Sequence, residues 1–199
     1  MGNLVLPTDH LREFATYAGT LASRYPTVQY WEVWNEANNP AFWQPRPDPG
    51  RYTQMLALAY NAIKPANPSA VVVLGGLSAG VRNGQADVVK GSDFLSAVYQ
   101  NGGRSYFDVV GFHPYDDGVA PQQCLTQALT DIHQVMVVNG DSDKKIWVTE
   151  VGWFAGTAPN AVSESGQAEY LTDAFTLLYN LDYVERAYWY NLRDYANSP

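Results

Sequence analysis

Ala70-Val71-Val72-Val73-Leu74-Gly75-Gly76 is the stretch that decides the fold. Its five apolar residues, three of them β-branched valines, predict a strand, and the two glycines predict its end. No polar residue alternates with the apolar ones, so both faces of this strand are expected to be covered. Such strands are typical of parallel sheets flanked by helices. The stretch therefore predicts an α/β fold.

Outward from this stretch, further apolar segments alternate with amphipathic ones. Strands are also expected over residues 28–35, 107–112, 145–149 and 186–190, and helices over residues 8–25, 52–63, 93–99, 125–138 and 165–179. The strict alternation predicts one parallel sheet of five strands with its helices outside. Neither a repeat nor a low-complexity tract divides the chain, so residues 1–199 are expected to form a single domain.

Composition excludes several classes of partner. With 12 basic and 20 acidic residues the formal net charge is −8, so nucleic acid and anionic membranes are not expected to bind. Cys124 is the only cysteine and the three histidines are scattered, so neither a metal nor another cofactor is expected. The 14 Tyr, 6 Trp and 7 Phe would suit the apolar faces of sugar rings, although aromatic residues also fill cores.

The sequence shows no sign of a leader or a membrane span. Asp9, His10, Arg12 and Glu13 place polar and charged groups close to the start, and no apolar run approaches the ~20 residues that a span needs. The chain is therefore expected to be cytoplasmic, or the mature form of a secreted protein.

Polar and aromatic side chains gather where the predicted strands end, which is where a parallel barrel places its active site. Two of them, Glu36 and Glu150, are carboxylates. Hydrolysis of a glycosidic bond needs such a pair, one to protonate the departing oxygen and one to stabilise or attack the sugar carbon. A single Glu at a strand end could equally form a salt bridge. Two of them, each close to a Trp, favour glycoside hydrolysis.

Several of these segments resemble signatures of clan A glycoside hydrolases, which are TIM barrels. Residues 31–38, Trp-Glu-Val-Trp-Asn-Glu-Ala-Asn, resemble the end of strand four, whose Glu is the acid/base. Residues 146–153, Ile-Trp-Val-Thr-Glu-Val-Gly-Trp, resemble the end of strand seven, whose Glu is the nucleophile. Residues 111–115 look like strand six and residues 187–190 like strand eight. The closest similarity is to the β-xylosidase-like family thirty-nine and its bacterial relatives.

The resemblance implies a partial (β/α)8 TIM barrel whose five strands correspond to strands four to eight. It also implies a retaining O-glycosidase for a β-linked glucoside, xyloside or glucan, with Glu36 as acid/base and Glu150 as nucleophile. Counterparts of strands one to three are missing, and with them an Arg beside the nucleophile. Three alternatives stay open: an inverting pair, a non-catalytic carbohydrate-binding remnant, and a structural fragment without a ligand.

Neighbouring residues have expected roles as well. Asn35 is expected to donate to the sugar 2-hydroxyl, and His113 or Tyr115 to hydrogen-bond Glu150 and keep it ionised. Glu32 lies on the same side of its strand as Glu36 and is expected to be a structural charge paired with an arginine.

Three tryptophans are candidates for sugar contacts. Trp189 is expected to lie under the sugar in the catalytic subsite, whereas Trp43 and Trp153, in loops, would line outer subsites. Packing in the barrel is the alternative for Trp189.

Five strands cannot close a barrel of eight, so the sheet is expected to have two open edges, at residues 28–35 and 186–190. Its inner face is expected to be wet and apolar, which favours a homodimer. Leu4-Val5-Leu6 is a candidate for capping an edge.

Overall fold

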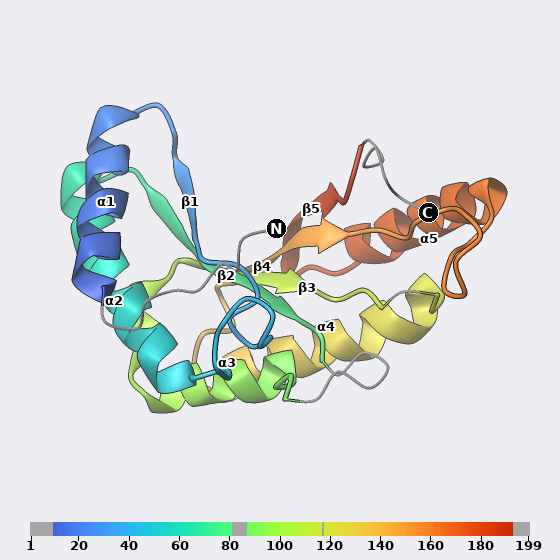
Figure 1. Cartoon of the computed structure of the whole chain (residues 1–199), viewed down its shortest axis with the longest axis horizontal. Helices are drawn as coiled ribbons and strands as arrows, with labels where there is room; N and C mark the ends of the chain where they lie inside the picture. The colour runs from blue at the N-terminus through green and yellow to red at the C-terminus, as the bar shows by residue number, and fades with distance from the viewer. Residues whose placement is uncertain (1–9, 81–86, 117, 193–199) are drawn as a thin grey trace.

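The computed structural model describes residues 10–80, 87–116 and 118–192, and these form a curved α/β layer (Figure 1). One parallel sheet has the strand order β1-β2-β3-β4-β5, so each strand pairs with the next one along the chain. The strands are β1 (Tyr30–Val33), β2 (Val71–Ser78), β3 (Val109–His113), β4 (Lys145–Val151) and β5 (Val184–Trp189). The predicted α/β order and parallel sheet are confirmed. That residues 1–199 form one domain stays a prediction.

Helices precede or connect the strands and cover one face of the sheet, while the opposite, concave face stays open (Figure 1). They begin where local chemistry allows: Asp48 caps α2 by accepting from the Arg51 N–H, and Ser163 caps α5 by accepting from the Gly166 N–H. The helices are α1 (Leu11–Arg24), α2 (Pro49–Ala66), α3 (Gly91–Gln100), α4 (Pro121–Val138) and α5 (Glu164–Tyr179), with a short 3₁₀ turn at Gly103–Tyr106.

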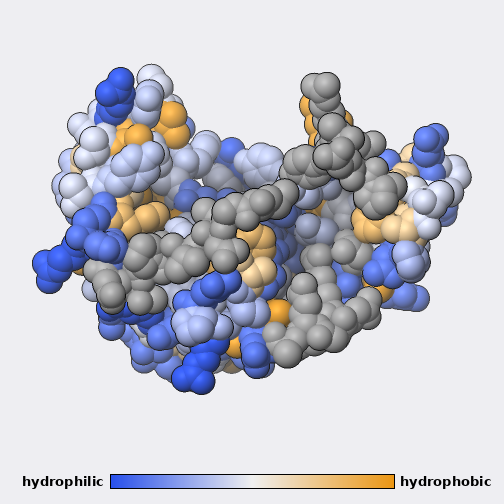
Figure 2. Space-filling model, in the orientation of Figure 1, coloured by the Kyte–Doolittle hydropathy of each residue, from blue (hydrophilic) through white to orange (hydrophobic). Residues whose placement is uncertain are grey.

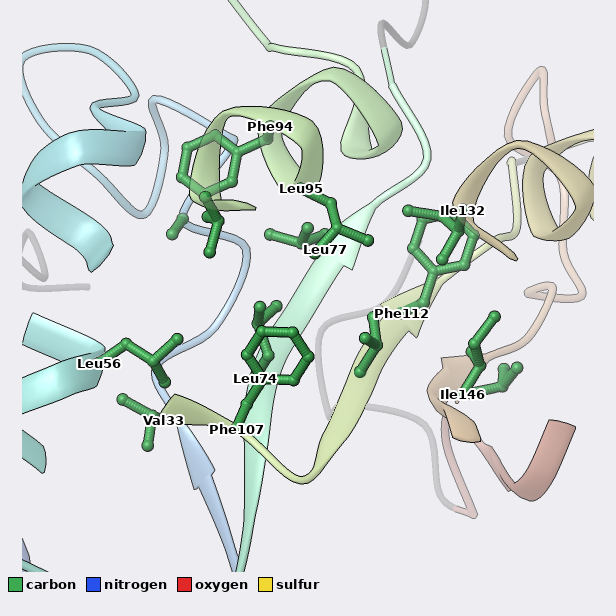
Figure 3. Packing of buried hydrophobic residues seen from close by; sticks show 14 of the residues in the cluster. Val33, Leu56, Leu74, Leu77, Phe94, Leu95, Phe107, Phe112, Ile132 and Ile146 are labelled. Carbon is green, nitrogen blue, oxygen red and sulfur yellow. The ribbon is translucent and has the colours of Figure 1, made fainter. Parts of the chain in front are cut away.

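The main core lies between the sheet and its helices. Leu74 and Leu77 of β2 point toward Phe94 and Leu95 of α3, and Phe112 of β3 points toward α4 (Figure 3). All of these side chains are buried. Removing one such side chain costs about 2–5 kcal/mol of the free energy of unfolding, so this layer fixes the sheet against its helices.

Most element boundaries differ from the predictions by a few residues, and two of the differences have a clear cause in the backbone. β1 ends at Val33 because Trp34, with φ of 73°, leaves the extended conformation. β2 continues to Ser78 through Gly75 and Gly76, where the sequence predicted its end. The register with β3 shifts between Leu74 and Leu77, so the glycines form an irregularity inside the strand.

The concave face is partly covered by side chains of the chain itself, while Tyr30 and Glu32 on the same face are exposed. Val73, Val109 and Trp147 form a second buried cluster there. The Tyr30 ring packs edge-on against the Trp147 ring, with ring centroids 5.0 Å apart. A hollow is visible between the two ends of the molecule in the space-filling view (Figure 2). Leu4-Val5-Leu6, the predicted edge cap, lies outside the described residues.

Candidate active site

Glu36 is held in an unusual backbone conformation directly after β1. Its φ is 44° and that of Trp34 is 73°, both in the left-handed region. This conformation costs a non-glycine residue roughly 1–2 kcal/mol, so the surroundings must impose it. One constraint is the Glu36 N–H, which donates to the Gly76 carbonyl at 2.9 Å. The turn directs the Glu36 side chain to the rim of the sheet, where the side chain is 11% exposed.

His113, at the end of β3, lies between the two halves of the site. Its side chain is 1% exposed. The Nδ1 atom lies 3.0 Å from Glu36 Oε1, and Nε2 lies 3.0 Å from the Thr149 hydroxyl oxygen. A Cβ at position 76 would overlap the His113 ring, so the absence of a side chain at Gly76 makes room for the imidazole.

Glu150, near the end of β4, approaches the same histidine. Tyr115 Oη donates to Glu150 Oε2 at 3.3 Å, and His113 Nδ1 lies 3.7 Å from that oxygen. Glu36 Oε1 and Glu150 Oε2 can therefore be no further apart than the sum of their distances to Nδ1, 6.7 Å. Two carboxylates separated by 114 positions in the sequence thus meet at one imidazole nitrogen.

The hydrogen-bond partners refine the predictions. Of the two candidates for Glu150, Tyr115 makes the hydrogen bond, whereas the short contact of His113 goes to Glu36. Asn39 was not predicted, yet its side-chain amide donates to Glu36 Oε2 at 3.0 Å. The only sequence signal for it was its place three residues after Glu36 in the same loop.

Among the described residues, Glu32 pairs with no arginine, which differs from the prediction. Its Oε1 accepts from the Gly76 N–H at 2.8 Å and from the Thr149 hydroxyl at 3.0 Å. Desolvation raises the pKa of Glu32, and these two hydrogen bonds oppose the rise. The Gly76 N–H that Glu32 accepts from lies at the register shift between Leu74 and Leu77 of β2.

The predicted sugar-contacting residues do not all gather here. Asn35 and Trp189 are half-buried at the ends of β1 and β5. Trp153 is buried, packs against Tyr115 and Trp189 with ring centroids 6.4 and 6.1 Å apart, and donates from its indole to the Val119 carbonyl. These contacts enclose the Trp153 ring, and its place in an outer subsite stays a prediction.

The Trp43 ring is more enclosed than its position in a loop suggested. Its side chain is 1% exposed and packs edge-on against the rings of Trp34 and Tyr52, with centroids 6.1 and 5.9 Å apart. The loop that carries it folds back onto α2, so a loop position did not mean an open one. Trp43 belongs to the core cluster and also lines a cavity with residues 44–49, and its contact with a sugar in an outer subsite stays a prediction.

Within residues 10–80, 87–116 and 118–192, no group of three or more His, Cys, Asp or Glu side chains is arranged to hold a metal ion. In the same residues no helix has both the length and the apolar character to cross a membrane.

Several solved structures of glycoside hydrolases are similar to this chain in fold. A family 39 glycoside hydrolase from Bacteroides cellulosilyticus WH2 is 25% identical, with a TM-score of 0.65 over 90% of this chain and 37% of its own. A monomeric β-xylosidase from Caulobacter crescentus CB15 is 20% identical, with a TM-score of 0.64 over 95% of this chain and 40% of its own. A GH128 endo-β-1,3-glucanase from Sorangium cellulosum is 18% identical, with a TM-score of 0.63 over 88% of this chain and 66% of its own.

The first two similarities confirm the partial TIM barrel, since this chain spans about two-fifths of those proteins. No curated protein sequence matches the chain. The family model described as "Glycosyl hydrolase catalytic core", however, matches residues 27–198, which include the sheet and both glutamates. The chain therefore belongs to the glycosyl hydrolase catalytic core family.

Proposed function

We propose that this chain carries the catalytic pair of a retaining glycoside hydrolase that cleaves a β-linked glucoside, xyloside or glucan. The observation that supports it most is the meeting of Glu36 and Glu150 at His113 Nδ1, with facing oxygens at most 6.7 Å apart. Retaining pairs lie about 5–5.5 Å apart, whereas inverting pairs lie about 6.5–9.5 Å apart to admit a water molecule. The upper limit here admits the retaining separation and reaches only the short end of the inverting range.

In the first step of this reaction, Glu36 donates its proton to the departing glycosidic oxygen while Glu150 attacks the anomeric carbon. The C–O bond to the leaving group breaks, and an ester bond between the sugar and Glu150 forms. In the second step the Glu36 carboxylate takes a proton from water, whose oxygen displaces Glu150 from the sugar. Both carboxylates end in their starting state.

The surroundings of the two carboxylates suit these different roles. Glu36 is the more enclosed, with side-chain exposure of 11% against 27% for Glu150. Enclosure disfavours charge and so suits a group that must hold a proton. Glu150 accepts a hydrogen bond from Tyr115, which stabilises the charged form that a nucleophile needs.

Two further residues are proposed to contact the sugar. Asn35 precedes Glu36 at the rim, where its amide can donate to the 2-hydroxyl and strengthen that bond in the transition state. Trp189 presents its ring at the end of β5, backed by Trp153. A flat aromatic surface in this place can carry the apolar face of a sugar ring.

The partner of the chain is proposed to be a second copy. A groove of about 730 Å³ runs between α5 and the edge strand β5, and its lining includes Phe175, Leu178, Tyr179 and Ala187. The strand edge also has unpaired backbone groups in this part of the structure, since β5 pairs only with β4 among the described strands. Covering both features in a two-fold pair would shield them from water.

A non-catalytic, carbohydrate-binding remnant is the second candidate. Its support is that the chain spans only 37–40% of several glycosidases that share its fold. Hydrolysis of aryl β-glucosides and β-xylosides by the purified chain, its Glu150→Gln variant and a surface control, Glu169→Gln, distinguishes the two. We expect turnover by the parent and the control and none by Glu150→Gln. Sugar binding without turnover in all three would favour the remnant.

A further inference from the structure

A chain of hydrogen bonds leads away from the proposed catalytic acid to a carboxylate that the proposed reaction does not use. It runs from Glu36 Oε1 to His113 Nδ1, from His113 Nε2 to the Thr149 hydroxyl, and from that hydroxyl to Glu32. Each of the three contacts is 3.0 Å long. The Gly76 N–H ends the chain by donating to the same Glu32 oxygen at 2.8 Å.

The positions of the protons along this chain follow from donor counting. An ionised carboxylate accepts hydrogen bonds and donates none, so Thr149 must give its single hydroxyl proton to Glu32. The Thr149 oxygen can then only accept from His113. Nε2 of His113 must therefore carry a proton, because a bare Nε2 would face the hydroxyl lone pairs at 3.0 Å.

We propose that Glu32 and Thr149 are positioning residues that fix the tautomer of His113, with the proton on Nε2, and thereby direct the Nδ1 lone pair at Glu36. This inference rests on the proposed function, in which Glu36 is the acid/base. It deepens that function by naming two residues that act on the acid through a third.

The consequence for Glu36 is specific. With Nε2 protonated, the contact between Nδ1 and Glu36 Oε1 holds together only when one proton lies between them, either on the carboxyl or on the imidazole. When Glu36 gives this proton to the leaving group, two lone pairs face each other at 3.0 Å. That repulsion makes Glu36 a stronger base for the second step, in which water returns the proton.

The architecture supports a dedicated arrangement. His113 is 1% exposed, so water does not compete for its nitrogens. Its ring fits only because position 76 has no side chain, and the Gly76 N–H stabilises the ionised form of Glu32. Glu150 is the other charged group near the ring, 3.7 Å from Nδ1. No contact of Glu150 with Nε2 competes with Thr149 in this part of the structure.

The test is the ¹⁵N NMR spectrum of the His113 ring in the full chain, which distinguishes protonated from unprotonated ring nitrogens. In the parent chain at neutral pH we expect Nε2 to be protonated. Glu32→Leu removes the acceptor, so the Thr149 hydroxyl can donate to His113 and the proton is expected to move to Nδ1. Glu32→Gln keeps an acceptor oxygen, and its spectrum is expected to match the parent.

Thr149→Val and Thr149→Ser form a second matched pair, because valine replaces the hydroxyl by a methyl group of similar size. We expect the valine variant to lose the fixed tautomer and to lower kcat roughly tenfold with KM within about twofold, a part of the usual contribution of acid–base catalysis. Serine is expected to restore both. Circular dichroism checks that each variant folds, and should Glu32→Leu fail to fold, the threonine pair decides.

An unprotonated Nε2 in the parent chain, or ring spectra of Thr149→Val identical to those of the parent, would overturn the proposal. The failure of the proposed function looks different. In that case the parent chain hydrolyses no glycoside, while the ring nitrogens still respond to the substitutions as expected.

Discussion

Arg186 on β5 donates a hydrogen bond from Nη2 to the phenolic oxygen of Tyr30 on β1, 2.8 Å away across the concave face of the sheet. The two residues are 156 positions apart and lie on the two edge strands of the described sheet. The Arg186 guanidinium also lies over the rings of Tyr30 and Trp147, 4.4 Å from each centroid. One side chain thus joins the two open ends of the incomplete barrel.

The contacts of Arg186 predict how Tm responds to mutation. Arg186→Met keeps most of the apolar stem but removes the donor and the cation over the two rings, so we expect a lower Tm. Tyr30→Phe removes only the hydrogen bond and is expected to lower Tm by less. Differential scanning fluorimetry measures both, and a Tm of Arg186→Met equal to that of the parent would show that the bridge does not hold the edges together.

Asp141 predicts the acid sensitivity of the fold. Burial raises its pKa, but hydrogen bonds from Lys144, Arg104 and Tyr99 outweigh this effect, so that the pKa lies below its ordinary value. A carboxyl with a lowered folded-state pKa stabilises the fold above its unfolded-state pKa, about 3.9, and this contribution is lost as the pH falls through the folded-state pKa. Asp141→Asn should therefore lower the free energy of unfolding at pH 7 by on the order of 2 kcal/mol, with a smaller deficit in acid.

Urea unfolding of Asp141→Asn at pH 7 and at pH 3 measures this deficit. Asp131→Asn is the matched control, since it breaks an ion pair with Lys90 on the surface and is expected to cost less than about 1 kcal/mol. Equal losses for the two variants would contradict the role of burial at Asp141.

The close packing around Gly76 predicts the effect of a side chain at this position. A Cβ there would overlap the His113 ring and come within 2.6 Å of Thr149 Oγ1, so Gly76→Ala should displace the histidine and abolish turnover. At Gly50, the nearest atoms to an added Cβ are 3.4 Å away, an ordinary contact. Gly50→Ala should therefore leave turnover unchanged. An active Gly76→Ala variant would mean that the position of His113 is not needed for catalysis.

The groove between α5 and β5 predicts the state of assembly. We expect light scattering at micromolar concentration to give the mass of a dimer. Phe175→Glu places a charge in the groove and is expected to give a monomer, whereas Val138→Glu, at an exposed position at the end of α4, should not. A monomeric parent chain with a cooperative melt would refute the proposed pairing.

The architecture followed from the sequence because it depends on local patterns. The valine run at residues 71–73 identified a covered parallel strand, and alternation with helices predicted one parallel sheet with its helices outside. Glu36 and Glu150 could be chosen because both follow a predicted strand. Their partners could not, since the bond between Thr149 and Glu32 joins residues 117 positions apart and depends on the irregularity at Gly76.

The burial of Trp43 is a feature that the sequence pattern did not predict. Its loop position suggested an exposed ring, but burial is a property of the tertiary contacts with Trp34 and Tyr52, which no local pattern contains. The same applies to Arg186, whose partner Tyr30 lies on a strand that is not its neighbour in the sheet.

The central claim is that Glu150 attacks the sugar. A 2-deoxy-2-fluoro-β-glycoside with a good leaving group slows the second step more than the first, so the covalent ester accumulates. The most direct measurement is therefore intact-protein mass spectrometry after incubation with this reagent, followed by peptide mapping. We expect the mass to rise by one fluorosugar carried on Glu150, and no rise with Glu150→Gln. An unmodified parent chain that nevertheless hydrolyses glycosides, or a sugar attached to a different residue, would contradict the claim.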